Sequence, residues 1–146
     1  MEKLDSIIFY NIDKAIRAYR NYAQRQLKEN GFNITIDQWL IIKAILENPE
    51  ITQNEIGNLV FKDNASVTRI IDLLVKSEFI IREIHPNDRR KTNLKVTKSG
   101  KDIIEKVQNL VESNRKVALE NVSKQELETM NTTLLKIAEN CINVKK

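Results

Sequence analysis

The sequence of 146 residues contains a single cysteine, Cys141, and a single histidine, His85. One cysteine excludes an intramolecular disulfide and a multi-cysteine metal site, and a single histidine removes most zinc, iron and triad chemistries. No apolar run approaches the length of a membrane span, and the first residues do not form a signal peptide. We therefore expect a cytoplasmic protein with no metal, no cofactor and no membrane partner.

Glycine, proline and aromatic residues are also scarce, with three Gly, two Pro and 5% aromatic residues. So few helix-breaking residues favour long helices over a turn-rich β fold. Apolar residues make up 41% of the chain, so Leu, Ile and Val must build most of a core. The net charge of +4 and the pI near 9.2 are compatible with a polyanionic partner but do not by themselves indicate one.

The spacing of apolar residues and the helix caps predict the order of the helices. Intervals of three and four predict an amphipathic helix over residues 4–29, which Asn30-Gly31 ends. Capping boxes, in which Ser or Thr stands three residues before Glu or Gln, predict helix starts after Thr35, Thr52 and Ser123. The predicted helices after the first are 36–47, 53–60, 65–77, a long helix that starts near Lys98 and a last helix after Ser123. Gly57 costs helix stability inside one of them, and a small residue there makes sense if another helix crosses closely.

A β-hairpin is predicted between the helix over 65–77 and the long helix. The strand-like run 79–81 and the alternation 94–97 flank a short polar tip that carries Asp88, Arg89, Arg90 and Lys91. Two arginines at a narrow tip suit the minor groove of DNA, where the negative potential is high. A solvated turn is the alternative for a hairpin considered alone.

Apolar stripes at both ends of the chain predict a homodimer. The last helix has a heptad-like seam, with intervals of three and four, at Leu127, Met130, Leu134, Ile137, Cys141 and Val144. The first helix adds a stripe at Leu4, Ile8 and Ile12. These are too many apolar side chains for one small domain to bury, so we expect the first helix and the last two to join two copies. Cys141 is then a small apolar member of the seam.

The order of these elements resembles the MarR family of winged-helix transcriptional regulators over nearly the whole chain. The resemblance rests on residues 35–39, 52–57, 66–74, 88–90 and 94–100. It implies a mainly α fold with a small β-hairpin wing, in which a winged helix-turn-helix is flanked by N- and C-terminal dimerisation helices. The expected divisions of this one compact chain are residues 1–34 for dimerisation, 35–99 for DNA binding and 100–146 for dimerisation.

The outward face of the helix over 65–77 is the expected reader of double-stranded DNA. Small and polar side chains let a helix lie close in the major groove, and the predicted contact residues are Asn64, Ala65, Ser66, Thr68 and Arg69. Gln53 and Asn54 stand at a helix N-terminus that can hold a phosphate, although they can equally be ordinary first-turn residues.

The family resemblance implies further roles in the wing and in a small pocket. Asp88 would hold Arg90 in the minor groove, while Arg89 and Lys91 point toward phosphates. Tyr19, Tyr22 and Trp39 would line a pocket for a small hydrophobic or aromatic anion, unless they are simply core residues. The implied function is that of a sequence-specific DNA-binding regulator. It would repress transcription from a pseudo-palindromic operator, and binding of such an effector would relieve the repression.

One stretch departs from the family pattern. Family members often carry Gly near the end of the recognition helix, where this chain has Ser77-Glu78-Phe79. Because a left-handed conformation is costly for an L residue, we expect this helix to end in a different way.

No constellation of residues indicates an enzyme, because the chain has neither a glycine-rich phosphate loop nor a histidine beside its acidic residues. The alternative to a regulator is a non-enzymatic helical adaptor that binds a protein through its C-terminal helices. Arg89 and Arg90 at the hairpin tip favour the regulator, since an adaptor has no need of them.

Overall fold

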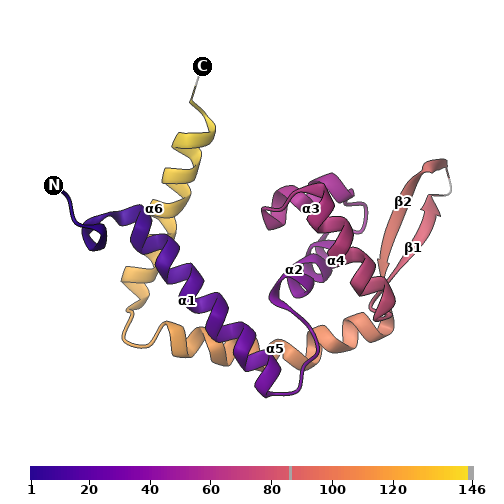
Figure 1. Ribbon diagram of the computed structural model, residues 1–146, viewed down its shortest axis with the longest axis horizontal. Helices are drawn as coiled ribbons and strands as arrows, with labels where there is room; N and C mark the ends of the chain where they lie inside the picture. The colour runs from indigo at the N-terminus through magenta and orange to yellow at the C-terminus, as the bar shows by residue number, and fades with distance from the viewer. Residues whose placement is uncertain (86, 145–146) are drawn as a thin grey trace. The chain divides into compact units, whose positions relative to one another are not determined.

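The computed structural model describes residues 1–85 and 87–144, and the side chains of these residues except 85 and 89–92. The chain forms two compact units, residues 1–114 and residues 115–146. Over the described residues the elements are η1 (Leu4–Ser6), α1 (Ile8–Glu29), α2 (Ile36–Glu47), α3 (Gln53–Val60), α4 (Asn64–Lys76), β1 (Ile80–His85), β2 (Asp88–Val96), α5 (Lys98–Ala118) and α6 (Lys124–Ile142) (Figure 1). This order confirms the predicted mainly α fold with a hairpin wing.

The first helix begins later than the apolar spacing predicts. Residues Leu4–Ser6 form a separate 3-10 turn, and Ile7 is extended, with φ −85° and ψ 116°, before α1 begins. At the other end the predicted stop is confirmed. Gly31 has a left-handed conformation, with φ +78°, and the amide of Phe32 donates to the carbonyl oxygen of Leu27.

The three predicted capping boxes are all present. The backbone N–H of Gln38 donates to Oγ1 of Thr35 at 3.1 Å, and the backbone N–H of Thr35 donates to the Gln38 side chain at 3.0 Å. The other two boxes pair Thr52 with Glu55 and Ser123 with Glu126. Each box satisfies two backbone donors that a helix start leaves open, so α2 and α3 have the bounds that the sequence predicts.

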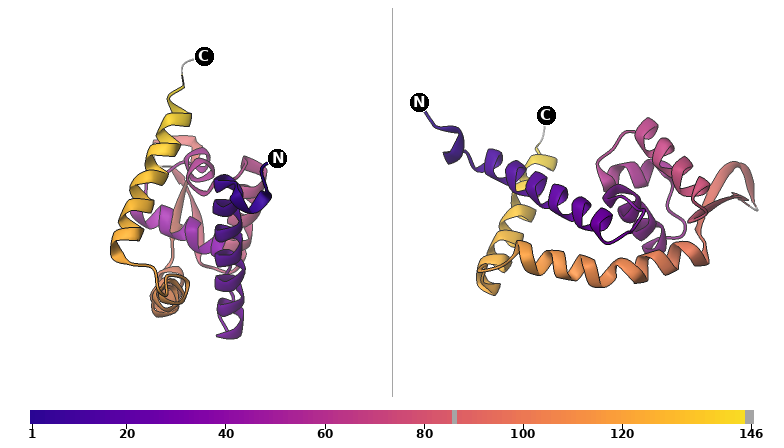
Figure 2. Two further views of the ribbon diagram at one scale, coloured as in Figure 1. Left: turned by 90° about the vertical axis from the view of Figure 1, so that its left-hand side faces the viewer. Right: turned by 60° about the horizontal axis from the view of Figure 1, so that its bottom comes forward.

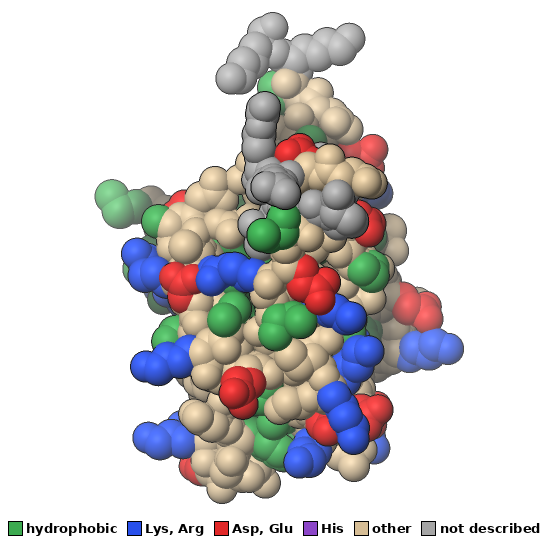
Figure 3. Space-filling model, turned by 90° about the vertical axis from the view of Figure 1, so that its right-hand side faces the viewer, with side chains coloured by type: hydrophobic (Ala, Val, Ile, Leu, Met, Phe, Trp, Pro, Cys, Tyr) green, Lys and Arg blue, Asp and Glu red, His purple; other side chains and the backbone are tan. Residues whose placement is uncertain are grey.

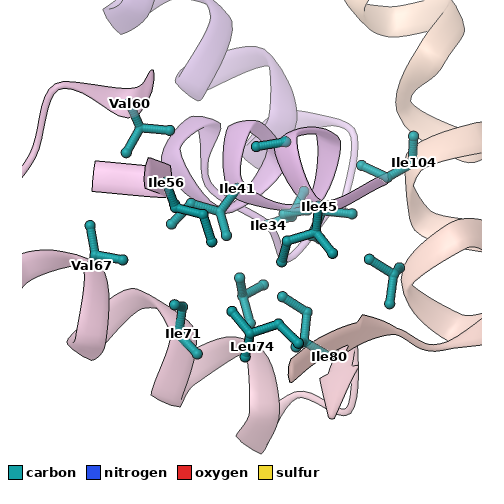
Figure 4. Packing of buried hydrophobic residues seen from close by; sticks show 14 of the residues in the cluster. Ile34, Ile41, Ile45, Ile56, Val60, Val67, Ile71, Leu74, Ile80 and Ile104 are labelled. Atoms are coloured by element: carbon teal, nitrogen blue, oxygen red, sulfur yellow. The ribbon is translucent and has the colours of Figure 1, made fainter. Parts of the chain in front are cut away.

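The core of the unit formed by residues 1–114 surrounds α2. Figure 4 shows side chains from α2, α3, α4 and β1 directed into one apolar cluster. Burial of each such side chain contributes about 1.5–3 kcal/mol to the free energy of unfolding. The largest fully buried side chains are Ile41, Ile42, Ile56, Val67, Ile71, Leu74, Ile80 and Val107.

Gly57 in α3 is required by a close backbone approach, but its close neighbour is not a crossing helix. A Cβ atom at Gly57 would lie 2.8 Å from the carbonyl oxygen of Lys62, in the turn after α3, and at an ordinary 3.6 Å from Val67 of α4. The turn folds back because Phe61 is left-handed, with φ 60° and ψ 43°, and the amide of Lys62 donates to the carbonyl of Gly57. The sequence-based explanation of Gly57 was therefore wrong in its partner.

The end of α4 corrects a second expectation, because Glu78 does adopt the left-handed conformation, with φ +66°. The amide of Phe79 donates to the carbonyl of Leu74 and the amide of Glu78 donates to that of Val75, both at 3.0 Å. These two bonds form a Schellman motif, the ending that usually has Gly at this position. The helix thus ends in the ordinary way, with a residue that bears the conformational cost.

The wing begins directly after this turn. Strands β1 and β2 pair antiparallel, with Ile80 opposite Val96 and Ile84 opposite Thr92, and the register shifts between Ile84 and His85. The base of the hairpin is in the core, since Ile80, Leu94 and Val96 are buried, whereas Ile84 is 72% exposed. Both Figure 1 and Figure 2 show the hairpin extending outward from beside α4 and the start of α5.

Helices α5 and α6 differ in how much of their apolar surface a single chain covers. In α5, Ile104 and Val107 are buried against the core. In α6 no residue is buried, and the seam residues Met130 and Leu134 are 48% and 38% exposed. Cys141 is also exposed in the single chain.

The ending of α4 gives a stability prediction. Glu78→Gly should raise the free energy of unfolding by about 0.5–1 kcal/mol, because a left-handed L residue costs about 1–2 kcal/mol and glycine's greater freedom when unfolded offsets part of the gain. The measurement is urea unfolding at one fixed protein concentration. As the matched control, Ser77→Gly changes the neighbouring right-handed residue, at φ −80°, and should destabilise the protein. A loss of stability in Glu78→Gly would contradict the account.

Candidate nucleic-acid interface

The N-terminus of α4 is fixed by a side-chain cap. The backbone N–H of Ser66 donates to Oδ1 of Asp63 at 2.7 Å. The hydrogen bonds from Ser66 hold the pKa of Asp63 below its ordinary value, and the positive charge of Arg69 acts in the same direction. Asp63 therefore stays ionised at neutral pH and satisfies an open donor of the helix.

The residues predicted to read DNA share one outward face of α4, over the buried residues Val67, Ile71 and Leu74. Ser66 is half-buried, and the others, Asn64, Ala65, Thr68 and Arg69, are exposed. Nη2 of Arg69 donates to Oγ of Ser66 at 3.2 Å, which places the guanidinium beside the first turn of the helix. This face presents small groups and one long cation, so its shape allows close approach to a groove.

A hydrogen-bond chain joins the start of α3 to this face. Nε2 of Gln53 donates to Oγ1 of Thr68 at 2.6 Å, and the Thr68 hydroxyl donates to the backbone carbonyl of Asn64 at 2.8 Å. The structure thus brings together two predicted contact residues that are fifteen positions apart. Asn54 is exposed in the first turn of α3, next to Gln53.

The structure also joins α4 to the wing through a pair that the sequence reasoning missed. Nη2 of Arg82, on β1, donates to Oδ1 of Asp72 on α4. Asp72 lies on the outward face of α4, one helical turn after Thr68 and Arg69, and no pattern in the sequence indicates a role for Arg82. Opposite charges on the two sides of a short helix-to-strand connection were the only available signal.

The predicted wing-tip contacts lie largely outside the described residues. The backbone of Arg89, Arg90 and Lys91 belongs to β2, but their side chains, like that of His85, are not among those described. Asp88 is half-buried and stands opposite His85 in the strand register. The roles of these residues in the minor groove remain a prediction.

A cavity of about 460 Å³ lies between α1, the start of α2 and the α3–α4 turn. Its wall includes an ion-pair group centred on Asp37. Nη2 of Arg20 is 2.6 Å from Oδ1 of Asp37, and Nζ of Lys62 is 3.3 Å from Oδ2 of the same carboxylate. Ile16 and Phe61, which is 92% exposed, supply an apolar part of the lining. One carboxylate thus connects three segments of the chain.

The aromatic residues predicted for an effector pocket do not line this cavity. Tyr19, Tyr22 and Trp39 are half-buried, and Trp39 packs against the core. Nζ of Lys43 lies 5.9 Å from the centre of the Trp39 ring, and the indole Nε1 is buried without a hydrogen-bond partner among the described residues. Their role as a binding site stays a prediction.

Other kinds of site find little support in the part of the chain that the structure describes. There is no group of three or more His, Cys, Asp or Glu residues able to hold a metal ion, and no helix has the length and apolar character of a membrane span. On the face in Figure 3, basic side chains lie among acidic ones. The net positive charge is therefore not gathered in one continuous patch on that face.

Comparison with known proteins agrees with this geometry. A sequence model of the MarR family matches residues 34–92, which run from just before α2 into β2. A protein of unknown function from Listeria innocua Clip11262 is 27% identical, with a TM-score of 0.69 and 91% of each chain covered. A cysteine-to-serine variant of MarR from E. coli, complexed with operator DNA, is 25% identical over 86% of this chain and 89% of that chain, with a TM-score of 0.79.

BpsR from Bordetella bronchiseptica, whose DNA binding is regulated by 6-hydroxynicotinic acid, has a TM-score of 0.84 with 94% of this chain and 97% of that chain covered. Its sequence identity is 16%, so this likeness shows the fold alone. The MarR family model matches the helix-turn-helix and part of the wing, and the likeness to MarR extends over most of the chain, so this chain is similar to the MarR family of regulators.

Proposed function

We propose that this protein is a transcriptional regulator that binds a pseudo-palindromic operator in duplex DNA as a homodimer, and that it is a repressor relieved by a small anion. The observation that carries DNA binding is the outward face of α4. Its small polar side chains and Arg69 stand on a helix that the core holds by Val67, Ile71 and Leu74. The relative from E. coli binds operator DNA, which supports the same role for this face.

Exposed apolar side chains support the dimer. Leu4 and Ile8 are 65% and 59% exposed near the N-terminus, and Leu127 and Leu134 of the α6 seam are 36% and 38% exposed. Ile12 and Ile137 are half-buried, and Cys141 is exposed on the same seam. Apolar surface of this extent marks an interface, and a two-fold axis would place two copies of α4 about one turn of DNA apart.

The cavity at Asp37 supports an anionic effector. Arg17, Arg20 and Lys62 bring three positive charges to its lining, against two carboxylates from Asp13 and Asp37. A ligand carboxylate can compete with Asp37 for Arg20 and Lys62 while an apolar body packs on Ile16 and Phe61. Because Lys62 belongs to the α3–α4 turn, this exchange would change how α4 is held and so shift the population away from the DNA-binding arrangement.

If α6 forms part of the dimer interface, a charged residue placed in its seam should weaken the dimer. The parent should sediment as a dimer at micromolar concentration, and Leu134→Asp should shift it toward monomer because a buried carboxylate without a partner is costly. Leu135→Asp makes the same change at a 64% exposed position off the seam and should leave the mass unchanged. A monomeric parent would contradict the dimer and favour an adaptor that binds another protein through α6.

DNA binding should depend strongly on salt. Each phosphate that the protein neutralises adds about −0.9 to the slope of log affinity against log salt. Arg90→Ala should weaken binding by about 1–3 kcal/mol, because the predicted groove contact is lost in both protomers. The measurement is fluorescence anisotropy with genomic fragments. Lys136→Ala, which removes one positive charge from α6, is the control and should bind like the parent. Parent protein that binds no fragment at low salt would rule out the function.

The effector proposal predicts a response to a simple aromatic acid. Millimolar benzoate should lower the DNA affinity of the parent, whereas benzamide, which has the same shape without the charge, should not. Lys62→Gln should bind DNA yet lose the benzoate response. Trp39→Phe tests the alternative site. If Trp39→Phe removes the benzoate response and Lys62→Gln does not, the effector binds near the aromatic residues instead.

A further inference from the structure

The base of the wing is held on one side by close contacts with Thr97 and the start of α5. Oγ1 of Thr97 donates to the carbonyl of Glu78 at 2.6 Å, and the amide of Thr97 donates to the carbonyl of Phe79 at 3.0 Å. Gly100 lets α5 approach this connection, since a Cβ there would lie 2.3 Å from the Phe79 oxygen. These contacts fix where the hairpin starts, but they all lie at its base.

Further out, the side chains that the structure describes give the hairpin no comparable apolar support. Ile81 is 42% exposed and Ile84 is 72% exposed, so neither side chain is packed into the core. A two-stranded hairpin alone is only marginally stable in water. The direction of its outer part therefore depends on the contacts that hold the outer end of the buried base.

The ion pair between Asp72 and Arg82 lies at the outer end of the buried base, where Arg82 stands opposite Leu94 in the strand register. It links α4 to the third residue of β1, across the corner made by the left-handed Glu78. The side chains are 56% and 39% exposed, and surface ion pairs of this kind contribute little to stability. Folding stability is therefore a poor explanation for the pair.

The position of Asp72 is unfavourable for binding DNA by charge alone. It stands one helical turn after Thr68 and Arg69 and so lies on the same outward face. A carboxylate on this face repels the phosphates that Arg69 would approach. The pairing with Arg82 offsets the negative charge of Asp72. The paired carboxylate can then fix the position of the Arg82 side chain.

We propose that Asp72 is a positioning residue, which holds Arg82 and with it the β1–β2 hairpin at a fixed angle to α4. The α4 helix and the wing are then already arranged to enter the major and minor grooves. The hairpin does not have to become ordered when DNA binds. The expected effect of Asp72 on DNA affinity rests on the proposed DNA-binding function. The effect of Asp72 on the order of the hairpin can be measured in the free protein.

The first test uses the free dimer and needs no DNA. In Asp72→Asn the order parameters of backbone amides in residues 81–84 and 93–95 should fall from the rigid range near 0.85 toward 0.6, as measured by nitrogen-15 relaxation. Glu83→Gln is the matched control, since it removes one exposed carboxylate from the adjacent residue of β1. Unchanged hairpin order in Asp72→Asn would overturn the proposal.

The second test uses the sign of the change in DNA affinity. Loss of a carboxylate from the DNA-facing surface predicts tighter binding by electrostatics, whereas loss of a positioning contact predicts weaker binding. Asp72→Asn should weaken binding by about five-fold or more, and Glu83→Gln should bind as tightly as the parent or more tightly.

The same substitution in an Arg82→Gln background separates the two effects. With Arg82 absent, Asp72 has nothing to position, so Asp72→Asn should then strengthen binding or leave it unchanged. Tighter binding by Asp72→Asn in the parent background would overturn the proposal while leaving DNA binding established. A parent that binds no DNA would refute the proposed function, and the relaxation measurement would still decide whether Asp72 holds the hairpin.

Discussion

Burial of α2 among α1, α3, α4 and β2 is the constraint on which the unit of residues 1–114 depends. Ile41 and Ile42 are fully buried and Ile45 is 2% exposed, so α2 contributes side chains in more than one direction. Isoleucine in a helix has one strongly preferred rotamer, and this stiffness suits a core that has few aromatic rings to define its shape. Because α3, α4 and the base of the hairpin all pack on this cluster, the positions of the outward-facing residues follow from the apolar residues beneath them.

The sequence predicted those features that depend on neighbours a few residues apart. The boxes at Thr35 and Thr52 and the stop at Gly31 are local, and α2 and α3 have the predicted bounds. The left-handed conformation of Glu78 was not predicted, because the sequence shows the cost of this conformation but not the contacts that stabilise it. Two backbone hydrogen bonds and the anchoring by Thr97 hold that conformation, and neither is visible in a local pattern. Gly57 shows the same limit, since the neighbour that requires it is a backbone carbonyl in a turn.

The candidate site likewise contains features that local sequence spacing predicts and contacts between distant residues that it does not. The outward face of α4 follows from helical spacing, so its members, Asn64, Ala65, Ser66, Thr68 and Arg69, were identified from the sequence, and they share this face over the buried Val67. The contact of Gln53 with Thr68 and that of Asp72 with Arg82 join residues fifteen and ten positions apart, and they depend on how α3, α4 and β1 meet. The ion-pair group at Asp37 draws on α1, α2 and the α3–α4 turn, which no single stretch of sequence could indicate.

The hydrogen-bond chain from Gln53 through Thr68 to the Asn64 carbonyl has a consequence for how such a protein could change its target sequence. A substitution at Thr68 leaves the Gln53 amide without its acceptor, and a substitution at Gln53 removes a brace from α4. These two positions are therefore expected to vary as a pair. Ser66 is tied to Arg69 through its hydroxyl, and to Asp63 through both its backbone N–H and its side chain. The part of the α4 surface that is free to acquire a new preference is thus smaller than the surface that faces the groove.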